Sequence, residues 1–472
     1  MTIPGTAIAS AVPVPAGPFS PAGQAGPVAR VFPAFCRVQA VAKPVADSEI
    51  HIEIWLPAAE AWNGKFLGTG NGGYSGAFGY SDMERGLRQG YAVAGSDTGH
   101  SGGDLKFGIG HPEKIADWAW RAVHVMTETA KLVVRSYYAR FASHAYFTGC
   151  STGGHQALTE AQRFPADYDG IVAGDPGNNR VRLNIGFLWS WLAANRDAQP
   201  PLTNSTLSLL NQAVLAACDE SDGIKDGIIG DPRACKFDPA ALRCKGAPEA
   251  SCLTESQVAA VRKIYDGARS PRTGERLYAG WVPGSESGWS GYFVAQREPA
   301  RLDFWRYWVF ADPNWDFHTF DFDRDTAYAD SAMDVLTANN SDLSRFEKRG
   351  GKLLLYQGWA DPVLPPDDTI RYFEAVQRTM GGAQNTAPFA RLFLAPGMGH
   401  CSGGPGPNSF DSLAALDAWV TRGQAPDRMI ATHSSNGSVD RSRPLCSYPQ
   451  VARWRGSGST DDASNFECTA AR

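Results

Sequence analysis

Residues 146–154 read Tyr146-Phe147-Thr148-Gly149-Cys150-Ser151-Thr152-Gly153-Gly154, and they contain the pattern Gly-x-Ser-x-Gly. A predicted strand, His144 to Thr148, leads into this stretch, and a predicted helix, Gly153 to Arg163, follows it. The turn between such elements is so sharp that side chains at the glycine positions would collide with neighbouring backbone. The pattern is common by itself, but its setting favours an exposed, nucleophilic Ser151 over an ordinary glycine-rich turn.

Two later loops offer the partners that a serine nucleophile needs. A serine hydroxyl reacts at neutral pH only when a base removes its proton, and a carboxylate orients that base. His400 follows a predicted strand, in Gly397-Met398-Gly399-His400-Cys401, and Asp361 follows another, in Gly358-Trp359-Ala360-Asp361-Pro362. The order serine, acid, histidine is that of α/β-hydrolases. We therefore predict Ser151 as the nucleophile, His400 as the base and Asp361 as the orienting acid.

The other histidines have simpler explanations. His124 and His144 fall in predicted regular elements, where packed or solvent-facing histidines are more usual than catalytic ones. His100 and His111 lie in loops near the expected working edge of the sheet, so they stay as weaker candidates for the base.

An acyl-transfer site also needs backbone N–H groups that face the developing oxyanion. The amide of Thr152, directly after the nucleophile, is the first expected donor. The second is expected from the loop 68–74, Gly-Thr-Gly-Asn-Gly-Gly-Tyr, where Gly72 is favoured and Gly73 is not excluded. The rival interpretation, a phosphate-binding loop, lacks the Gly-Lys-Ser/Thr ending that would hold phosphate and magnesium.

The nine cysteines indicate an oxidising compartment. Three close pairs bracket turn-rich polar segments, as short-loop disulfides do: Cys218 with Cys235, Cys244 with Cys252, and Cys446 with Cys468. Cys150 precedes the predicted nucleophile and Cys401 follows the predicted base, so a bond between them would tie the two catalytic loops together. It would close a loop of about 250 residues, worth roughly 5 kcal/mol in the chain-entropy model. Cys36 is the odd cysteine, either free or paired elsewhere.

The chain alternates predicted strands and helices at both ends, which favours an α/β fold with a parallel sheet. Strands are expected at 51–56, 65–67, 91–94 and 144–148, and again at 352–356 and 391–394; His51 to Leu56 alternates like a strand at an exposed edge. Helices are expected at 115–133, 153–163, 369–377 and 410–420. The intervening stretch, roughly 178–335, loses this alternation and is rich in tryptophan. We interpret it as an inserted lid domain between a first core segment, 1–177, and a second, 336–472.

The lid contains an acidic loop, residues 218–229, that predicts a structural calcium site. Asp219, Asp222 and Asp226 place three carboxylates in one tight turn, and Gly223 and Gly227 let the backbone fold around a centre. The carbonyls of Ile224 and Ile228 could complete the oxygen shell that a hard cation prefers. The regular spacing of an EF-hand is missing, and a solvated acidic turn is the alternative.

Composition narrows the class of partner. The 472 residues carry a formal net charge of -5, so a nucleic-acid partner is not expected. No uncharged apolar run approaches the roughly 20 residues of a membrane helix. The first 29 residues contain no Lys or Arg, unlike a signal peptide, so a mature end is expected, and the cysteines point to a secreted or periplasmic protein.

With these motifs in place, the chain resembles the tannase and feruloyl esterase family, which includes hydrolases of mono(2-hydroxyethyl) terephthalate. The resemblance rests on Gly149 to Gly154, on Gly358 to Pro362, on Gly399-His400-Cys401 and on Asp175-Pro176. It implies an α/β-hydrolase core with an inserted lid, a disulfide between Cys150 and Cys401, and a lid calcium ion. The calcium ligands would be the positions matching Asp219, Asp222, Ile224, Asp226 and Ile228. Cys36 departs from relatives that form an additional amino-terminal disulfide.

The resemblance further implies a serine esterase acting on small esters of aromatic acids, feruloyl, galloyl or related, of plant cell-wall or polyphenol origin. Gln357 and Thr152 stand where terephthalate hydrolases have a histidine and a glutamate, which favours a feruloyl-type substrate over terephthalate. Two other hypotheses stay open: a serine peptidase on the same core, and a calcium-stabilised polyphenol- or carbohydrate-binding protein with an inactive core.

Overall fold

The computed structural model describes residues 3–21 and 30–470, and these form two compact units. The first unit comprises Met1–Asn178 and Ala338–Leu353, and the second comprises Asn179–Thr337 and Leu354–Arg472. The unit boundaries fall beside the limits expected for the lid, but the second unit also takes in the carboxyl-terminal segment. A separate lid domain therefore stays a prediction.

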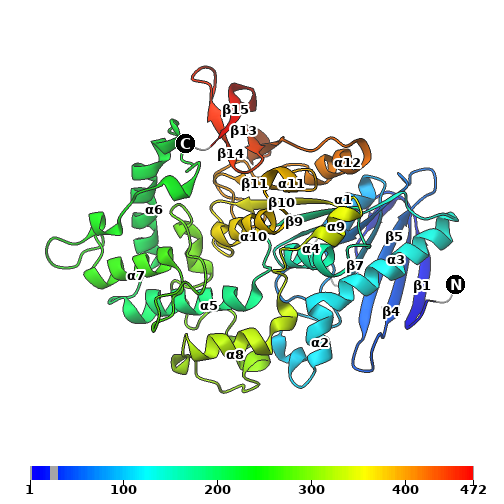
Figure 1. Ribbon diagram of the computed structural model, residues 1–472, viewed down its shortest axis with the longest axis horizontal. Coiled ribbons are helices and arrows are strands. Elements are labelled where there is room, and N and C mark those ends of the chain that lie inside the picture. The colour runs from blue at the N-terminus through cyan, green and yellow to red at the C-terminus, as the bar shows by residue number, and fades with distance from the viewer. Residues whose placement is uncertain (1–2, 22–29, 471–472) are drawn as a thin grey trace. The chain divides into compact units, whose positions relative to one another are not determined.

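A mixed β-sheet forms the centre of the first unit (Figure 1). Its strands pair in the order β1, β4, β5, β7, β6, β8 and β9. Pairing is antiparallel from β1 through β7, and parallel from β7 through β6 and β8 to β9. The bounds are β1 Thr6–Val14, β4 Phe35–Ala42, β5 Ile50–Pro57, β6 Lys65–Thr69, β7 Ala92–Ser96, β8 His144–Cys150 and β9 Gly170–Gly174; β2 (Gly17–Phe19) and β3 (Arg30–Phe32) form a separate ribbon.

Strands β7 and β9 are apolar and buried along their whole length, so both faces of the sheet need a cover there. Helices provide this cover. The helices are α1 (Tyr80–Arg88), α2 (Pro112–Ala116), α3 (Ala122–Tyr138), α4 (Thr152–Arg163) and α9 (Ser344–Lys348). A π-helical turn, Asp117–Arg121, joins α2 to α3, so the predicted helix over 115–133 is present and longer. Helix α3 crosses β5, β6 and β7, and α4 packs on β8 and β9 (Figure 1).

Strand β5 is an interior strand, so the expectation of an exposed edge at His51 to Leu56 was wrong. It pairs with β4 on one side and β7 on the other, and only His51 is exposed. The apparent alternation came from Glu53, a charged residue that is 2% exposed. Its carboxylate accepts hydrogen bonds from Arg37 Nε at 2.9 Å, Trp55 Nε1 at 3.0 Å and Tyr80 Oη at 2.9 Å.

The second unit is helical from Asn179 to Thr337, where the described chain contains no strand beyond isolated bridges. Its α-helices there are α5 (Arg180–Trp191), α6 (Asn204–Cys218), α7 (Glu255–Asp266) and α8 (Arg324–Ala332), with π-helical turns at Leu192–Asp197 and Phe304–Val309. The carboxyl-terminal part holds β10 (Lys352–Gly358), which begins in the first unit, and its neighbour β11 (Ala390–Ala395). It also holds α10 (Pro366–Thr379), α11 (Ala383–Thr386), α12 (Ser412–Arg422) and the hairpins β12 (Arg428–Ser435) with β13 (Ser438–Cys446) and β14 (Gln450–Trp454) with β15 (Phe466–Ala470).

Both units also contain short 3₁₀ helices, at Leu105–Gly108, Asp219–Asp222, Pro232–Ala234, Pro239–Leu242, Glu286–Gly291, Phe317–Thr319, Asp334–Leu336 and Ala463–Asn465.

Within the described residues, none of the helices combines the length and apolar character that crossing a bilayer requires.

Replacing Glu53 tests the ion pair between β4 and β5, in which Glu53 is buried and Arg37 is half-buried. In Glu53→Ala, Arg37 loses its counter-charge and two buried donors lose their acceptor, and we expect the free energy of unfolding to fall by about 3–5 kcal/mol. Urea titration measures this change. Glu49→Ala removes an exposed carboxylate paired with Lys43 and should leave the unfolding curve nearly unchanged; equal losses in both variants would contradict the interpretation.

Candidate active site

Ser151 lies in a strained turn between β8 and α4. Its backbone has φ 64° and ψ -116°, a region that non-glycine residues rarely occupy. Two hydrogen bonds hold the turn: the Ser151 amide donates to the Gly174 carbonyl at 2.9 Å, and the Gly177 amide donates to the Ser151 carbonyl at 3.0 Å. The strain projects the serine side chain away from the helix that follows, as nucleophilic catalysis requires.

Close backbone packing requires two glycines of this turn, Gly149 of the motif and Gly154 directly after the motif. A Cβ atom on Gly149 would lie 2.5 Å from the backbone of Gly153, and one on Gly154 would lie 2.4 Å from the carbonyl oxygen of Gly174. Both distances are far below van der Waals contact, so no side chain fits. The sequence argument for a sharp turn thus has a steric cause at these two positions.

The glycine-rich loop after β6 packs directly against this turn. A Cβ atom on Gly70 would lie 2.5 Å from the Cα atom of Gly153, and the Thr152 hydroxyl donates to the Gly73 carbonyl at 2.6 Å. The first unit therefore brings the residues predicted as oxyanion donors, Thr152 and the 72–73 glycines, into one place. A Cβ atom added to Gly72 or Gly73 would meet no other atom within 4 Å. Which of the two amides donates to the oxyanion stays a prediction.

Asn71 and Gln156 fix the loop in this position, and the sequence analysis missed both roles. The Asn71 amide donates to Gln156 Oε1 at 2.9 Å, and Gln156 Nε2 donates to Asn71 Oδ1 at 3.1 Å. Asn71 Nδ2 also donates to the carbonyl of Ser96 at the end of β7, at 2.8 Å. The only hint in the sequence is an asparagine within a run of glycines.

The second unit pairs Asp361 with His400. His400 Nδ1 lies 2.8 Å from Asp361 Oδ2, and the carboxylate is fully buried while the imidazole is 21% exposed. Asp361 Oδ1 accepts hydrogen bonds from the amides of Val363 at 2.7 Å and Leu364 at 3.0 Å. A carboxylate held in this way orients the imidazole and stabilises its protonated form.

The loops that carry these two residues are joined by their backbones. The Trp359 amide donates to the Ala395 carbonyl at 3.0 Å, and the Ala360 amide donates to the Met398 carbonyl at 2.9 Å. A Cβ atom on Gly358 would lie 2.4 Å from the Gly399 carbonyl oxygen. The glycine before Trp359 is therefore needed for the acid loop to approach the histidine loop.

Gln357 is a positioning residue that the sequence analysis considered only as a marker of substrate type. It is fully buried, and its Nε2 donates to Asp361 Oδ2 at 3.2 Å. Its Oε1 accepts from the Thr369 hydroxyl of α10 at 2.8 Å, which fixes the direction of the amide. Gln357 therefore satisfies the same carboxylate oxygen that faces His400.

Disulfides join the cysteine pairs that the sequence brackets: Cys218–Cys235, Cys244–Cys252 and Cys446–Cys468. Cys150 and Cys401 are also disulfide-bonded. Cys36 is free and half-buried, and burial raises the pKa of its thiol.

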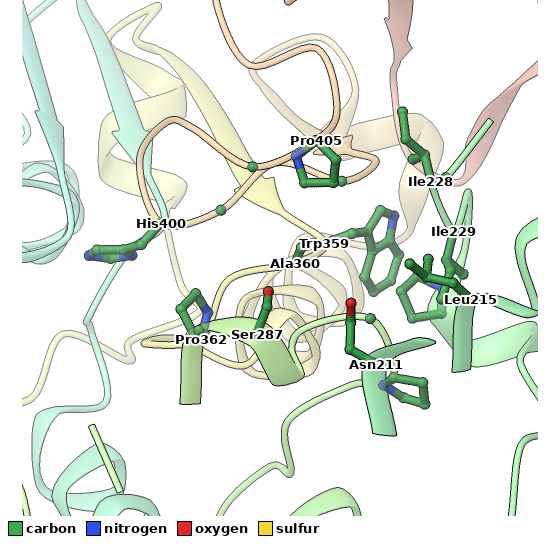
Figure 2. A pocket seen from close by; sticks show the side chains of 18 residues that line it. Asn211, Leu215, Ile228, Ile229, Ser287, Trp359, Ala360, Pro362, His400 and Pro405 are labelled. Carbon is green, nitrogen blue, oxygen red and sulfur yellow. The ribbon is translucent and has the colours of Figure 1, made fainter. Parts of the chain in front are cut away.

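A cavity of about 260 Å³ lies beside His400 in the second unit. Figure 2 shows His400 at one end and the ring of Trp359 with Ile228 and Ile229 at the other. Ser287 and Asn211 line the space between them. A wall with one aromatic face, aliphatic side chains and a few hydrogen-bonding groups suits a small aromatic ligand.

The predicted calcium loop folds tightly around its carboxylates. Asp219 Oδ1 accepts from the amides of Gly227 at 3.0 Å and Ile228 at 3.2 Å, and Asp222 Oδ1 accepts from Ile224 at 3.0 Å. Burial, with the negative charge of Asp226, raises the pKa of Asp222 to about 6. Arg443 donates to Asp226 Oδ2 at 2.8 Å and is the closest cation to the loop's carboxylates. Carboxylates with neighbouring backbone carbonyls form an all-oxygen donor set, which fits a hard cation.

The fold and the nucleophile turn define the class: the chain is an enzyme of the α/β-hydrolase type. Residues 36–469 match the family described as tannase and feruloyl esterase. Because the match spans nearly the whole sequence, the chain belongs to this family. Its fold class and its identity as a carboxylic ester hydrolase are thereby confirmed.

Relatives of known name agree with this assignment. An uncharacterised esterase of Xanthomonas campestris pv. campestris is 38% identical over 99% of this chain and 90% of its own length. The mono(2-hydroxyethyl) terephthalate hydrolase of Piscinibacter sakaiensis is 35% identical over 94% and 86%. The crystal structure of feruloyl esterase B from Aspergillus oryzae superposes with a TM-score of 0.92 at 32% identity, covering 99% of this chain and 98% of that one. A binding protein with an inactive core is accordingly set aside.

Gln357→Leu tests the positioning role of the buried amide. One hydrogen bond to a charged group contributes about 1.5–3 kcal/mol, so we expect kcat for ester hydrolysis to fall by roughly tenfold or more with a smaller change in KM. Steady-state kinetics on a chromogenic ester measures both constants. Gln377→Leu, at a half-buried position of α10, is the control; an unchanged kcat in Gln357→Leu would remove the role.

Proposed function

We propose that the chain hydrolyses esters of aromatic acids, feruloyl esters foremost, with Ser151, His400 and Asp361 as the catalytic triad. The observation that carries the proposal is the strained backbone of Ser151 beside the glycine-rich loop. Such strain persists only where the surrounding structure enforces it, and it is typical of nucleophile turns. The Asp361–His400 pair supplies the remaining two members.

The mechanism follows from these groups. His400 accepts the proton of Ser151 as the hydroxyl oxygen attacks the ester carbonyl carbon, and Asp361 stabilises the imidazolium that forms. The amides of Thr152 and Gly72 donate to the oxyanion of the tetrahedral intermediate. His400 then protonates the leaving alcohol, and water, deprotonated by the same imidazole, releases the acid from the acyl-enzyme.

A disulfide between Cys150 and Cys401 is part of this proposal. Each cysteine directly adjoins a triad residue, and each is disulfide-bonded while the other three disulfides use different cysteines. The bond would fix the distance between the nucleophile turn and the histidine loop. It would thereby restrict the two loops to arrangements in which the imidazole can reach the hydroxyl.

The substrate class is supported by the cavity beside His400 and by the relatives. Trp359 offers a ring face, and an offset aromatic pair contributes about 0.5–1.5 kcal/mol beyond burial. The named relatives include a feruloyl esterase and a hydrolase of a terephthalate ester. The ester in each of these two names contains an aromatic acid. Gln357 and Thr152 favour the feruloyl type; gallate and terephthalate esters are the alternatives.

Eight of the nine cysteines are disulfide-bonded, which supports a secreted or periplasmic enzyme. We propose in addition that a structural Ca²⁺ is held by the carboxylates of Asp219, Asp222 and Asp226 with the carbonyls of Ile224 and Ile228. When bound, the ion neutralises the buried carboxylates and stiffens the loop. Ile228 also lines the cavity, so the loop shapes the wall near Trp359.

Ser151→Ala tests the mechanism. The kcat of the variant on methyl ferulate should fall by about 10⁵–10⁶-fold, the size of loss seen when a triad nucleophile is removed. The control is Ser205→Ala, at an exposed position of α6, which should keep full activity. A panel of methyl ferulate, methyl gallate and mono(2-hydroxyethyl) terephthalate, with a feruloyl amide added, then ranks substrates by kcat/KM. Retained turnover in Ser151→Ala would overturn the triad; preference for another ester would correct only the substrate.

Calcium removal tests the metal site. Chelation should lower Tm, because a ligand at a hundred times its Kd adds about 2.7 kcal/mol of stability. Asp219→Ala should have the Tm of the chelated, unaltered chain even without chelator, and adding chelator should not lower its Tm further. Glu220→Ala changes an exposed neighbour in the same loop and should respond to chelator like the unaltered chain. If chelator leaves the Tm of the unaltered chain unchanged, the proposed calcium site is wrong.

A further inference from the structure

His124, Glu160 and Asp167 form a cluster in the first unit that ester hydrolysis does not use. His124 lies on α3, Glu160 lies near the end of α4, and Asp167 lies in the loop between α4 and β9. Each offers one ligand atom, and the three atoms lie within 4.8 Å of one another. The closest pair is His124 Nδ1 and Asp167 Oδ2, at 2.6 Å.

Glu160 is the unusual member of this cluster. It is fully buried, and in the part of the chain that the structure describes no N–H donor reaches its carboxylate oxygens; the carboxyl group of Asp167 is its hydrogen-bond partner. Burial, with the negative charge of Asp167 and the hydrogen bond to it, raises the pKa of Glu160 well above the ordinary value. Two adjacent carboxyl groups, one of them fully buried, are costly to ionise together without a cation beside them. Lys131 is the nearby cation, and its ammonium donates to the backbone carbonyl of Asp167.

We propose that His124, Glu160 and Asp167 bind a divalent transition-metal ion of the zinc class. One imidazole nitrogen with two carboxylate oxygens is a donor set that Zn²⁺ and its neighbours accept, whereas Ca²⁺ and Mg²⁺ prefer oxygen alone. In a tetrahedral site with bonds of about 2.1 Å, neighbouring ligand atoms lie about 3.4 Å apart. The three atoms of the cluster lie within 4.8 Å of one another, and His124 Nδ1 and Asp167 Oδ2 are closer than the tetrahedral spacing, so these two side chains move apart to admit the ion.

The surroundings provide an approach and an outer partner for the imidazole. The side chains of His124 and Asp167 are 23% and 10% exposed, so the cluster is open to solvent on their side, whereas Glu160 is fully buried. Glu128, one helical turn along α3 and largely exposed, lies 3.6 Å from His124 Nε2, the ring nitrogen that faces away from Asp167, and can orient the ring. A bound ion would join α3 to α4, the helix that begins directly after Ser151. The site is therefore structural, remote in sequence and in chemistry from the calcium loop.

Zinc titration of the calcium-saturated, full-length chain tests the proposal. Isothermal titration calorimetry should detect a site in the unaltered chain whose affinity falls at least about tenfold in His124→Ala and in Glu160→Gln. Tm should rise with Zn²⁺ in the unaltered chain and respond less in both variants. Zinc binding to groups that all variants share, the His400–Asp361 pair included, cancels in these differences.

His433→Ala is the matched control, because His433 also pairs with an aspartate, Asp440, at 2.6 Å on the β12–β13 hairpin but belongs to no such three-residue cluster among the described residues. It should bind zinc like the unaltered chain. Ester hydrolysis measured on each variant reports folding, and Asp167→Asn replaces Glu160→Gln if the latter does not fold. Zinc binding unchanged in His124→Ala, or weakened equally in His433→Ala, would overturn the site; the first outcome would leave Glu160 as a protonated carboxyl group beside Asp167.

Discussion

The backbone of Ser151 is the constraint on which the arrangement of the first unit depends. An L-residue at φ 64° and ψ -116° costs free energy of the order of 1–3 kcal/mol, which neighbouring structure must offset. It is offset by hydrogen bonds from the turn to Gly174 and Gly177 and by the packing of α4 on β8 and β9. The same close packing admits only glycine at 149 and 154. The strain and the glycines are therefore two consequences of one sharp connection between a buried strand and its helix.

The second unit meets a different demand, that of burying one carboxylate away from water. Asp361 is fully buried, and a buried charge is tolerated only when donors replace its hydration. Two backbone amides satisfy one oxygen, and Gln357 and His400 satisfy the other. Because Thr369 fixes the Gln357 amide, the acid has a single orientation before any substrate arrives. The imidazole is thus positioned by a network that reaches into α10.

Local patterns sufficed for the elements around Ser151 and Asp361, but several other elements were missed. The strand before Ser151, the helix after it and the strand before Asp361 were all predicted, because each has a clear period or an apolar run with turn residues beside it. Strand β1 was missed because it is exposed along most of its length and has no buried face to show in the sequence. Strand β4 was missed although its burial alternates and it pairs with the next strand in the chain, β5. Helix α5 was missed because it is buried almost all round and shows little periodicity. Helix α7 had a readable start, the capping box Thr254 with Gln257, that was overlooked.

The site divides along similar lines. The residues proposed to perform the chemistry, Ser151, Asp361 and His400, stand in short motifs and could be nominated from the sequence. Gln156 and Gln357 bind partners 85 and 12 positions away and carry no local pattern. The same division bears on specificity. Asn211 and Ser287, from the helical region between 179 and 337, line the cavity that contains His400, while the contacts that enforce the φ of Ser151 come from other residues. Substitutions in that region can therefore reshape the cavity beside His400 without relaxing the strained turn at Ser151.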